Sequence, residues 1–328
     1  MDEFELIGRY FSRLGVARSD VVLGIGDDAA LLCVPDGAEL AAAVDTIVAG
    51  RHFPADSDAR SVGHRALAVN LSDLAAMGAT PAWATLALTL PAADPEWLER
   101  FAAGFSELAA AHTVALVGGD TTAGPLTVSV QIMGHVPRGS ALRRSGARAG
   151  DLLAVTGTLG DAGAGLALAT HALATQDLRS ARELQGRFEY PVPRVEFGLA
   201  ARGIATAAMD LSDGLAGDLP KLAAASELAA HVEIDRLPLS HALQSVADPQ
   251  QVRQWALGAG DDYELLLAVP PDRFPGLAAR AAQLNLRLTA IGELRRGNAV
   301  TWTLHGAEID PRIQGYDHFR RASTQITV

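Results

Sequence analysis

Short acidic clusters beside glycine or threonine recur at the ends of apolar segments of this chain. They are Gly24-Ile25-Gly26-Asp27-Asp28, Asp45-Thr46, Gly118-Gly119-Asp120-Thr121-Thr122, Asp210-Leu211-Ser212-Asp213-Gly214 and Gly260-Asp261-Asp262-Tyr263-Glu264. Carboxylate oxygens are ligands of hard cations, and Mg²⁺ binds proteins through a few carboxylates together with substrate phosphates. The clusters therefore predict metal-dependent phosphate chemistry.

These clusters also have ordinary structural explanations, such as a charged loop entering a strand at 260–264. Asp27 and Asp28 could close a strand through an Asx turn, since glycine and aspartate are common turn residues. Ser212 or Asp213 could cap the helix that follows, because both residue types accept hydrogen bonds from free N–H groups. A helix cap would explain one polar residue of the 210–214 cluster, but the presence of Asp210 would need a second explanation. The repetition of the pattern favours metal binding over a set of unrelated turns.

Asp73 lies in the last turns of a helix that the periodicity predicts over residues 59–77. An unpaired carboxylate there faces the negative end of the helix dipole, which is unfavourable by about 0.3–1 kcal/mol. A bound cation would reverse the sign of that interaction, and Asn70 lies on the same helix face three residues earlier. A solvated aspartate at a helix end is the alternative explanation.

Phosphate binding must depend on arginine, backbone N–H groups and metal, because Lys221 is the one lysine of the chain and its context is not a Walker A loop. The glycines at 118–119 could let N–H groups approach a phosphate, although a tight hairpin turn is the alternative. Arg143-Arg144 could clamp a polyphosphate or could be exposed linker charge. The segment 157–165 does not fit G-x-G-x-x-G, so we interpret it as a close-packed strand-to-helix turn.

Composition excludes several classes of protein. The 328 residues favour two domains, and 49% hydrophobic residues supply ample core. A net charge of −11 argues against a general nucleic-acid binder. No apolar segment reaches the length of a membrane span, and the acidic N-terminus differs from a signal peptide, so we expect a cytoplasmic protein without membrane partners. Cys33 is the one cysteine, which excludes an intrachain disulfide.

Hydrophobic periodicity and turn residues predict an alternation of helices and strands in both halves of the chain. We expect helices at 3–14, 59–77, 94–111, 195–202, 215–225 and 273–284, and a helix through Leu166 and Leu168. We expect strands at 21–23, 40–44, 84–90, 114–117, 126–136, 152–156, 206–209, 232–234, 265–269, 286–291 and 300–304. This alternation predicts an α/β (α+β) protein of two domains.

The turn-rich segment 139–150 is the best candidate for a linker between the two domains. We therefore expect an N-terminal domain at 1–138 and a C-terminal α/β domain at 151–319. Residues 320–328 carry no motif and are expected to form a tail.

Taken together and in this order, the segments resemble the thiamine-monophosphate kinase family, within the ATP-binding superfamily that includes aminoimidazole ribonucleotide synthetase and selenophosphate synthetase. The resemblance runs from Phe4 to Phe319. The segments that carry it are 24–30, 45–46, 50–53, 70–79, 118–121, 144–146, 210–215, 261–264 and Gly315-Tyr316-Asp317-His318-Phe319. Each segment alone is weak, but the ordered set is specific for this family.

The resemblance implies transfer of the γ-phosphoryl group of ATP to thiamine monophosphate, giving thiamine diphosphate and ADP, the last step of thiamine diphosphate biosynthesis. It implies several Mg²⁺ ions and assigns roles to individual residues. The implied Mg²⁺ ligands are Asp28, Asp45, Asp73, Asp120, Asp210 and Asp213; Gly119, Asp120, Arg144 and Ser212 would face ATP; His52, Asp261 and Tyr316 would contact thiamine monophosphate. The acceptor phosphate is already ionised near neutral pH, so no general base is assigned.

The family fold implied is an N-terminal ferredoxin-like sheet domain that forms a homodimer, followed by a C-terminal α/β domain. Members commonly have Ser or Thr at the two positions before Asp45. This chain has Ala43 and Val44 there, so a metal contact at these positions would come from a backbone carbonyl or be missing.

Two other functions stay open at this point. A superfamily relative could activate an amide or selenide with ATP; a relative that uses selenide would need a reactive Cys or selenocysteine, and Cys33 lies in an apolar segment that we expect to be buried. A non-catalytic Mg²⁺-binding or nucleotide-binding regulator is the second alternative. A lone histidine such as His52 is also more often structural than functional.

Overall fold

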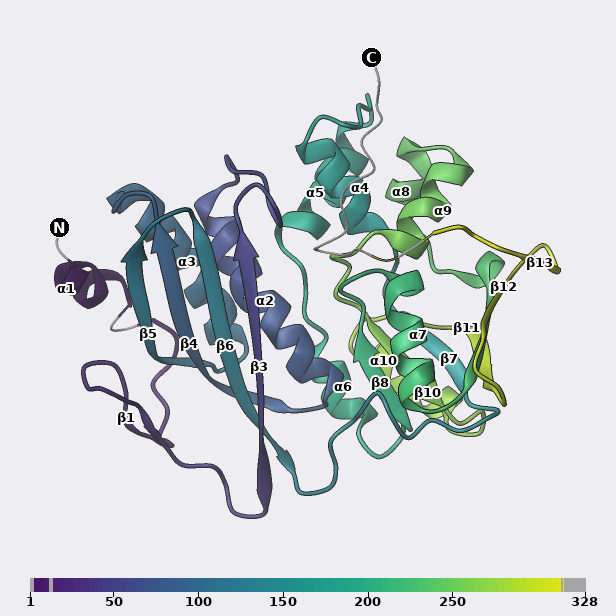
Figure 1. The fold of residues 1–328 in the computed structure, drawn as a ribbon, viewed down its shortest axis with the longest axis horizontal. Coiled ribbons are helices and arrows are strands. Elements are labelled where there is room, and N and C mark those ends of the chain that lie inside the picture. The colour runs from purple at the N-terminus through teal and green to yellow at the C-terminus, as the bar shows by residue number, and fades with distance from the viewer. Residues whose placement is uncertain (1–2, 12–13, 314, 316–328) are drawn as a thin grey trace.

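The computed structural model describes residues 3–11, 14–313 and 315, and Figure 1 shows two α/β units side by side. Within these residues, the N-terminal unit holds a four-stranded sheet of order β3-β6-β4-β5, and the C-terminal unit holds a seven-stranded sheet of order β13-β12-β9-β11-β7-β10-β8. The predicted fold class, an α/β protein of two sheet-containing units, is confirmed.

The N-terminal unit follows a β-α-β-α-β-β order, with α2 and α3 on one face of its sheet (Figure 1). Its elements are α1 (Glu3–Leu6), a π-helical turn (Ile7–Phe11), β1 (Val21–Leu23), β2 (Leu31–Leu32), β3 (Ala38–Val48), α2 (Ala59–Ala76), β4 (Thr80–Leu90), α3 (Pro95–Ala111), β5 (Ala115–Ala123) and β6 (Thr127–Pro137). Strands β4 and β5 are parallel, and β6 pairs antiparallel with both β3 and β4.

The C-terminal unit places its helices around a mostly antiparallel sheet. Its elements are β7 (Leu152–Thr156), α4 (Asp161–Ala169), α5 (Leu178–Glu189), α6 (Val195–Ala201), β8 (Ala207–Asp210), α7 (Leu215–Ala225), β9 (Ala229–Glu233), a 3₁₀ turn (Ile234–Arg236), α8 (His241–Val246), α9 (Pro249–Gly258), β10 (Leu265–Val269), α10 (Phe274–Gln283), β11 (Leu288–Arg295), β12 (Val300–Leu304) and β13 (Ala307–Ile309). Helices α5, α8 and α9 were not expected from the sequence.

Helix α3 begins where the sequence predicts it. The side chain of Asp94 accepts a hydrogen bond from the Glu96 N–H at 3.0 Å, and Pro95 occupies the first turn, where its missing N–H costs nothing. Phe101 and Phe105 are fully buried on the face that packs against α2. The cap and the apolar stripe together fix the start and the orientation of this helix.

Helix α2 lies between the two units and is buried on almost every side. It packs against α3, β3 and β6 of its own unit and against α5, α6 and β8 of the other. Glycine makes the contact with α3 close: a Cβ on Gly63 would lie 2.1 Å from the Phe101 carbonyl oxygen, and one on Gly104 would lie 2.0 Å from that of Arg60. A helix buried all round has no polar face, so each polar side chain of α2 needs a specific partner.

Cys33 is exposed, so the expectation that it is buried was wrong. It follows β2, which forms a two-stranded ribbon with β1 rather than a core strand. Tyr316 and the proposed boundary at 319–320 lie outside the described residues. Among the helices that the structure describes, none is both long and apolar enough to cross a membrane.

Candidate active site

A cavity of about 530 Å³ lies between the N-terminal unit on one side and strand β8 with Arg144 on the other. It is lined by Leu40, Ala41, Ala42, Ala43, Val44, Asp73, Leu74, Ala76, Met77, Arg144, Ala208, Met209 and Asp210. Strand β3 and helix α2 form one wall, and β8 with Arg144 forms the other. Three of the residues that the resemblance implies for metal or ATP therefore line one cavity.

Asp45 and Asp73 come together because β3 and α2 are in contact. The backbone N–H of Asp45 donates to the Asn70 Oδ1 atom at 3.0 Å, and the buried Asn70 amide in turn donates to the Ala66 carbonyl at 2.9 Å. This chain of hydrogen bonds fixes the register of β3 along α2. The Asp45 and Asp73 carboxylates are thereby close enough for each to influence the pKa of the other.

Asp210, from the C-terminal unit, lines the same cavity as Asp73. It ends β8, its side chain is buried, and its Oδ2 atom accepts a hydrogen bond of 2.9 Å from the Ser72 hydroxyl of α2. Ser72 is fully buried, so this contact joins the two units directly beside Asp73. Sequence reasoning did not identify Ser72, although it precedes Asp73 in the segment that carried the resemblance.

Burial and mutual repulsion disfavour the ionised forms of these carboxylates. Burial, and then the charges of Asp210 and Asp45, raise the pKa of Asp73 to about 8. Burial raises the pKa of Asp210 to about 6, although the Ser72 hydrogen bond lowers it. Burial also raises the pKa of Asp45. Such a group of carboxylates is stabilised as anions by an added cation.

The donor set fits Mg²⁺ bound together with phosphate. In the described part of the chain, no three acidic, His or Cys side chains converge into a preformed metal-binding cluster. A site built entirely from protein ligands is therefore not what the structure offers. Mg²⁺ commonly uses one or two carboxylates and takes its other ligands from water and substrate phosphates, and the pairs Asp45–Asp73 and Asp73–Asp210 suit that mode.

The loop after β8 is not explained by helix capping. Gly214, at φ +87°, occupies the N-cap position of α7, and no side chain caps that helix. The interpretation of Ser212 or Asp213 as a cap is therefore wrong. Asp213 instead pairs with the Lys221 ammonium at 2.5 Å, and that ammonium also contacts Asp218 at 2.9 Å. Asp213 is close enough to Asp45 for its charge to raise the pKa of Asp45.

Asp120 lies on the other face of the N-terminal sheet. Across the strands, Thr46 pairs with Ser129, Ser129 with Ala87, and Ala87 with Asp120. Thr46 and Ser129 share a hydrogen bond on the face opposite α2, so Asp120 lies on that face, whereas Asp45 lies on the α2 face. β5 and β3 are opposite edges of the sheet, roughly 14 Å apart across three strand spacings.

Asp28 is also outside the cavity. It is exposed in the loop between β1 and β2, and its N–H donates to the Asp27 side chain at 2.8 Å. Val21 and Leu32, which flank this loop, pack on the sheet face that carries Asp120. One chain therefore holds Asp45, Asp73, Asp210 and Asp213 near enough to influence one another's charge, without forming a preformed cluster among the described residues, and it holds Asp28 and Asp120 elsewhere.

Gly119 belongs to strand β5, so the hairpin-turn explanation of the 118–122 segment is wrong. Its φ is +154°, and a Cβ there would lie 1.9 Å from the Leu86 carbonyl oxygen of β4. The backbone of β5 can approach its neighbour this closely only at glycine. Arg144 lines the cavity, and the charge of its guanidinium lowers the pKa of Asp73.

His52 has a structural contact, as the cautious interpretation expected. Its Nδ1 atom accepts a hydrogen bond of 3.0 Å from the Val48 N–H at the end of β3. The neutral ring therefore carries its proton on Nε2. This contact orients the imidazole and still allows Nε2 to act as a donor.

The acidic segment 260–264 divides into three different environments. Asp261, at φ +71°, pairs with Arg65 of α2. Asp262 is buried and accepts from the Gly160 and Ala162 N–H groups; burial raises its pKa well above the ordinary value. Glu264 is fully buried among two arginines. Sequence reasoning treated the segment as one cluster and missed all of these partners.

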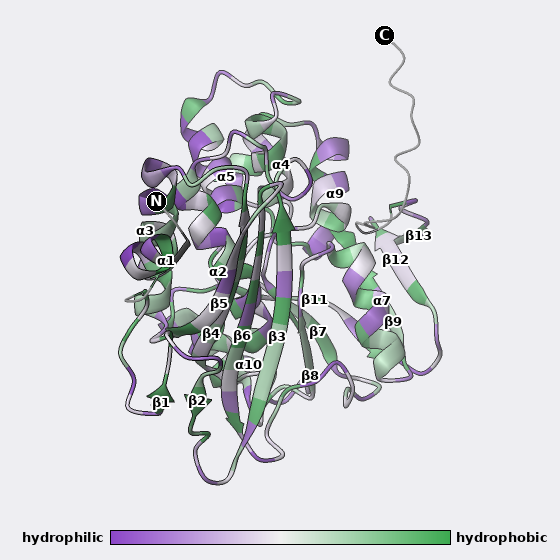
Figure 2. Ribbon diagram, turned by 60° about the vertical axis from the view of Figure 1, so that its left-hand side comes forward, coloured by the Kyte–Doolittle hydropathy of each residue, from purple (hydrophilic) through white to green (hydrophobic). Residues whose placement is uncertain are grey.

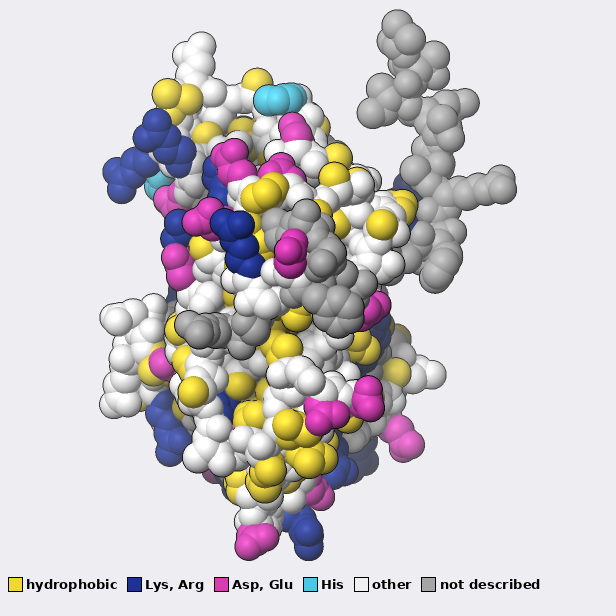
Figure 3. Space-filling view, turned by 90° about the vertical axis from the view of Figure 1, so that its left-hand side faces the viewer, with side chains coloured by type: hydrophobic (Ala, Val, Ile, Leu, Met, Phe, Trp, Pro, Cys, Tyr) yellow, Lys and Arg dark blue, Asp and Glu magenta, His cyan; other side chains and the backbone are white. Residues whose placement is uncertain are grey.

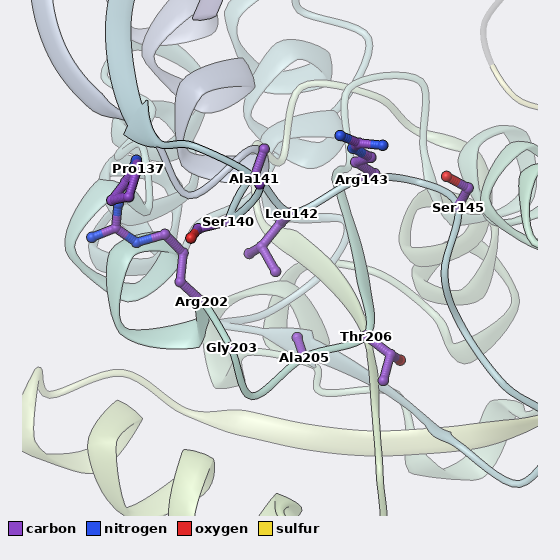
Figure 4. Close-up of a pocket in the computed structure, with 11 residues that line it drawn as sticks. Pro137, Ser140, Ala141, Leu142, Arg143, Ser145, Arg202, Gly203, Ala205 and Thr206 are labelled. Atoms are coloured by element: carbon purple, nitrogen blue, oxygen red, sulfur yellow. The ribbon is translucent and has the colours of Figure 1, made fainter. Parts of the chain in front are cut away.

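A second hollow of about 470 Å³ lies beside the 139–150 segment. Figure 4 shows Arg202 reaching toward Pro137 and Ser140 at its wall, with Leu142, Ala205 and Thr206 around it. Among the described residues that line this hollow, none is acidic. It therefore differs in chemistry from the carboxylate-lined cavity.

Comparison with known proteins gives two family matches and several full-length relatives. Residues 26–136 match the model for the N-terminal domain of AIR synthase related proteins, and residues 148–304 match the model for their C-terminal domain. The thiamine-monophosphate kinase of Salmonella typhimurium is 46% identical over 318 residues, covering 97% of this chain and 98% of the relative.

Solved structures agree with these matches. The crystal structure of thiamine-monophosphate kinase from Stenotrophomonas maltophilia K279a has a TM-score of 0.85 and 47% identity, covering 93% of this chain and 97% of that one. The structure of AaThiL complexed with AMPPCP and TMP has a TM-score of 0.77 and 30% identity, covering 88% and 89% of the two chains.

Proposed function

Because the chain belongs to the thiamine-monophosphate kinase family, we propose that it transfers the γ-phosphoryl group of ATP to thiamine monophosphate. The products are thiamine diphosphate and ADP. The observation that carries this proposal is that Asp73 and Asp210, which come from different units, line one cavity, and that Asp210 accepts a hydrogen bond from the Ser72 hydroxyl beside Asp73. AaThiL, a relative of similar fold, holds AMPPCP and TMP together, and these are an ATP analogue and the acceptor.

The carboxylates of the cavity suit a reaction between two anions. Phosphoryl transfer needs positioning and charge compensation more than covalent help. When bound, Mg²⁺ neutralises the phosphates and aligns the attacking and leaving oxygens. Asp45, Asp73 and Asp210 would hold the ions, and Asp213 would exchange its contact with Lys221 for a further ion.

The nucleotide and the acceptor would lie on opposite sides of these ions. Arg144 supplies a cation for the ATP phosphates, and Ser212, with Gly119 and Asp120 from the second copy proposed below, would face the nucleotide. His52 and Asp261 would contact thiamine monophosphate, with Tyr316 as a third contact. The nucleophile is a phosphate oxygen that is already ionised, so the chain needs to orient it rather than remove a proton from it.

We propose a homodimer in which a second copy supplies Asp28 and Asp120 to the site. β3 is an edge strand of the described sheet, and Val44, at 65% exposure, lies on the same outer face as Asp120. Figure 2 shows predominantly hydrophobic colour along β3. Figure 3, which faces the side of the molecule with α1, β1 and β5, shows hydrophobic side chains gathered in its lower half. An apolar patch of this kind favours a partner surface, and a copy placed there would bring its own Asp120 to this sheet.

The edge position of β3 also bears on Ala43 and Val44. The Asp45 N–H points away from β6, toward Asn70. Because backbone groups alternate in direction along a strand, the Ala43 carbonyl points to the same free edge, and the Val44 carbonyl points to β6. Ala43 is therefore the position whose carbonyl could contact an ion.

We keep 1–138 and 151–319 as the proposed domains, joined by 139–150 and followed by the tail 320–328. We also keep the cytoplasm as the proposed location, since the reaction consumes ATP. Neither proposal changes the assignment of the site.

The proposed reaction is tested by incubating the purified chain with ATP, Mg²⁺ and thiamine monophosphate and measuring thiamine diphosphate. Formation of thiamine diphosphate is expected, and chelation of Mg²⁺ should abolish it. Turnover of another acceptor but not of thiamine monophosphate would favour a superfamily relative. ATP binding without any turnover would favour a regulator.

The shared site is tested by mixing two inactive variants. Asp120→Asn and Asp73→Asn should each abolish turnover while leaving the fold intact. If Asp120 comes from the second copy, heterodimers of the two variants contain one intact site, and mixing should restore roughly a quarter of the wild-type activity. No recovery in a mixture shown to contain heterodimers would contradict the shared site.

A further inference from the structure

Arg65 is a buried cation of α2 that the proposed reaction does not yet use. Its side chain is 3% exposed, and its guanidinium pairs with the Asp261 Oδ1 atom at 2.5 Å. The Nη1 group donates to the Phe188 carbonyl at 2.5 Å, and the guanidinium carbon lies 4.4 Å from the centre of the Phe188 ring. Arg65 therefore joins the N-terminal unit to two separate segments of the C-terminal unit.

The segment that Arg65 holds has an unusual backbone. Asp261 has φ +71° and Tyr263 has φ +48°, and both values are strained for residues other than glycine. The Tyr263 hydroxyl donates to the same Asp261 Oδ1 atom at 3.1 Å, and the Asp261 N–H donates to the Ser212 carbonyl at 3.0 Å. Strain of this kind persists where surrounding contacts determine it, and it is often found at functional sites.

We propose that Arg65 is a positioning residue that fixes the acceptor-binding carboxylate of Asp261 relative to the metal-binding carboxylates. This inference rests on the proposed function, because it takes Asp261 as a contact of the phosphate acceptor. Within the described residues, both side-chain contacts of Asp261 are made to Oδ1. The Oδ2 atom is thereby left for the acceptor.

The geometry of α2 explains how one side chain can set this spacing. Arg65 precedes Ser72 by seven residues, so these two side chains lie on one helix face, roughly 10 Å apart along the axis, and Asp73 follows Ser72 directly. At one end Arg65 holds Asp261, and at the other Ser72 holds Asp210. A rigid helix thus carries both contacts and sets the distance between the acceptor and the ions.

The burial of Arg65 makes its shape as important as its charge. Its Nε atom has no hydrogen-bond partner among the described residues, so the two terminal nitrogens make both contacts. A lysine has one ammonium in place of this planar fork and cannot reproduce both contacts with the same geometry. The positioning role therefore predicts that Arg65→Lys fails to restore function although it keeps the charge.

The test compares Arg65→Lys and Arg65→Met with Arg60→Met in the intact chain. Arg60 is on the same helix but is exposed, and it pairs with Glu107 on the surface. For both Arg65 variants we expect the KM for thiamine monophosphate to rise about tenfold or more, as for residues that orient a ligand-binding group. The KM for ATP and the Kd of AMPPCP should stay within about twofold, and Arg60→Met should match the wild type.

Two further results decide between positioning and general stability. The effect of Arg65→Met on the KM for thiamine monophosphate should largely disappear in an Asp261→Asn background, because residues that act as a unit are not additive. Equal losses for ATP and acceptor, full additivity with Asp261→Asn, or wild-type kinetics in Arg65→Lys would each overturn the inference. Wild-type chain that forms no thiamine diphosphate in the same assay would refute the proposed function instead, and AMPPCP binding would still report whether Arg65→Lys is folded.

Discussion

The buried carboxylate of Glu264 is surrounded by cations, whereas those of Asp73 and Asp210 face other carboxylates. Glu264 is fully buried and accepts from Arg187 at 2.7 Å, from Arg194 and from the Thr156 hydroxyl at 2.6 Å. Although burial alone would raise it, these contacts lower the pKa of Glu264. At Asp73 and Asp210, burial and the nearby carboxylates outweigh the stabilising contacts, so the pKa values of both groups are raised.

This difference separates a structural use of buried charge from a functional one. The charge of the Glu264 carboxylate is compensated by Arg187 and Arg194. Removing either the carboxylate or an arginine would therefore leave an uncompensated ion in the core. For the Asp73 and Asp210 carboxylates, we propose that a cation bound with the substrate compensates the charge. The two groups should therefore respond in opposite ways to removal of a charge.

The largest effect is expected for Asp210→Asn. Loss of a metal-binding carboxylate should remove several kcal/mol of transition-state stabilisation, which corresponds to a fall in kcat/KM of about 10³-fold. The free energy of unfolding should stay unchanged or rise, because the variant removes a repelling charge. Kinetics and urea unfolding of the same preparation measure both quantities; a strongly destabilised variant would place Asp210 with Glu264 instead.

Glu264→Gln should show the opposite pattern. The variant leaves Arg187 and Arg194 without their shared anion, and breaking a buried ion group in this way destabilises a protein by about 3–5 kcal/mol. Urea unfolding should report that loss. Unchanged stability would mean that the two arginines reach water, and the comparison with Asp210 would fail.

Sequence patterns placed the aspartates that we propose as metal ligands within or at the ends of strands and helices. Asp45 lies on a strand, Asp210 ends one, and Asp73 lies in the last turn of α2, and each position follows from apolar periodicity. The partners were not predictable in the same way. Arg65 meets Asp261 across 196 positions of chain, and only the packing of α2 between the two units brings them together.

Two misses have specific physical causes. Helix α5 was not predicted because its buried face consists of few apolar residues, with Leu184 and Phe188 as the large ones. The alternation of side chains along β5 could not predict on which face of the sheet Asp120 lies, because a bulge opposite Ala84 and Thr85 shifts the register of this strand. One extra residue in a strand moves every later side chain to the other face.

The effect of Mg²⁺ on thermal stability should depend on pH. The pKa of Asp73 is about 8 in the folded chain, against an ordinary 3.8, so between these values the folded chain retains a proton that the unfolded chain has lost. Stability therefore falls as pH rises through this window. Because Mg²⁺ needs ionised carboxylates, the rise in Tm that it causes should be larger at about pH 8.5 than at about pH 5.5. Asp73→Asn should remove most of that difference, and Glu264→Gln should not.

Lys221 gives the smallest expected effect, because its environment is intermediate between the two groups. Its side chain is 43% exposed, and its ammonium bridges Asp213 to the buried Asp218. Burial raises the pKa of Asp218 even with that cation present, so Lys221→Met should destabilise the fold by about 1–2 kcal/mol, less than loss of a fully buried pair because water reaches the lysine. Urea unfolding measures this loss of stability. The control Arg60→Met, which breaks an exposed pair, should change stability by at most about 0.5 kcal/mol.

If added Mg²⁺ restores the stability of Lys221→Met but leaves Arg60→Met unchanged, an external cation can replace the ammonium at Asp213. A loss that Mg²⁺ does not restore would place Lys221 with the structural cations of Glu264.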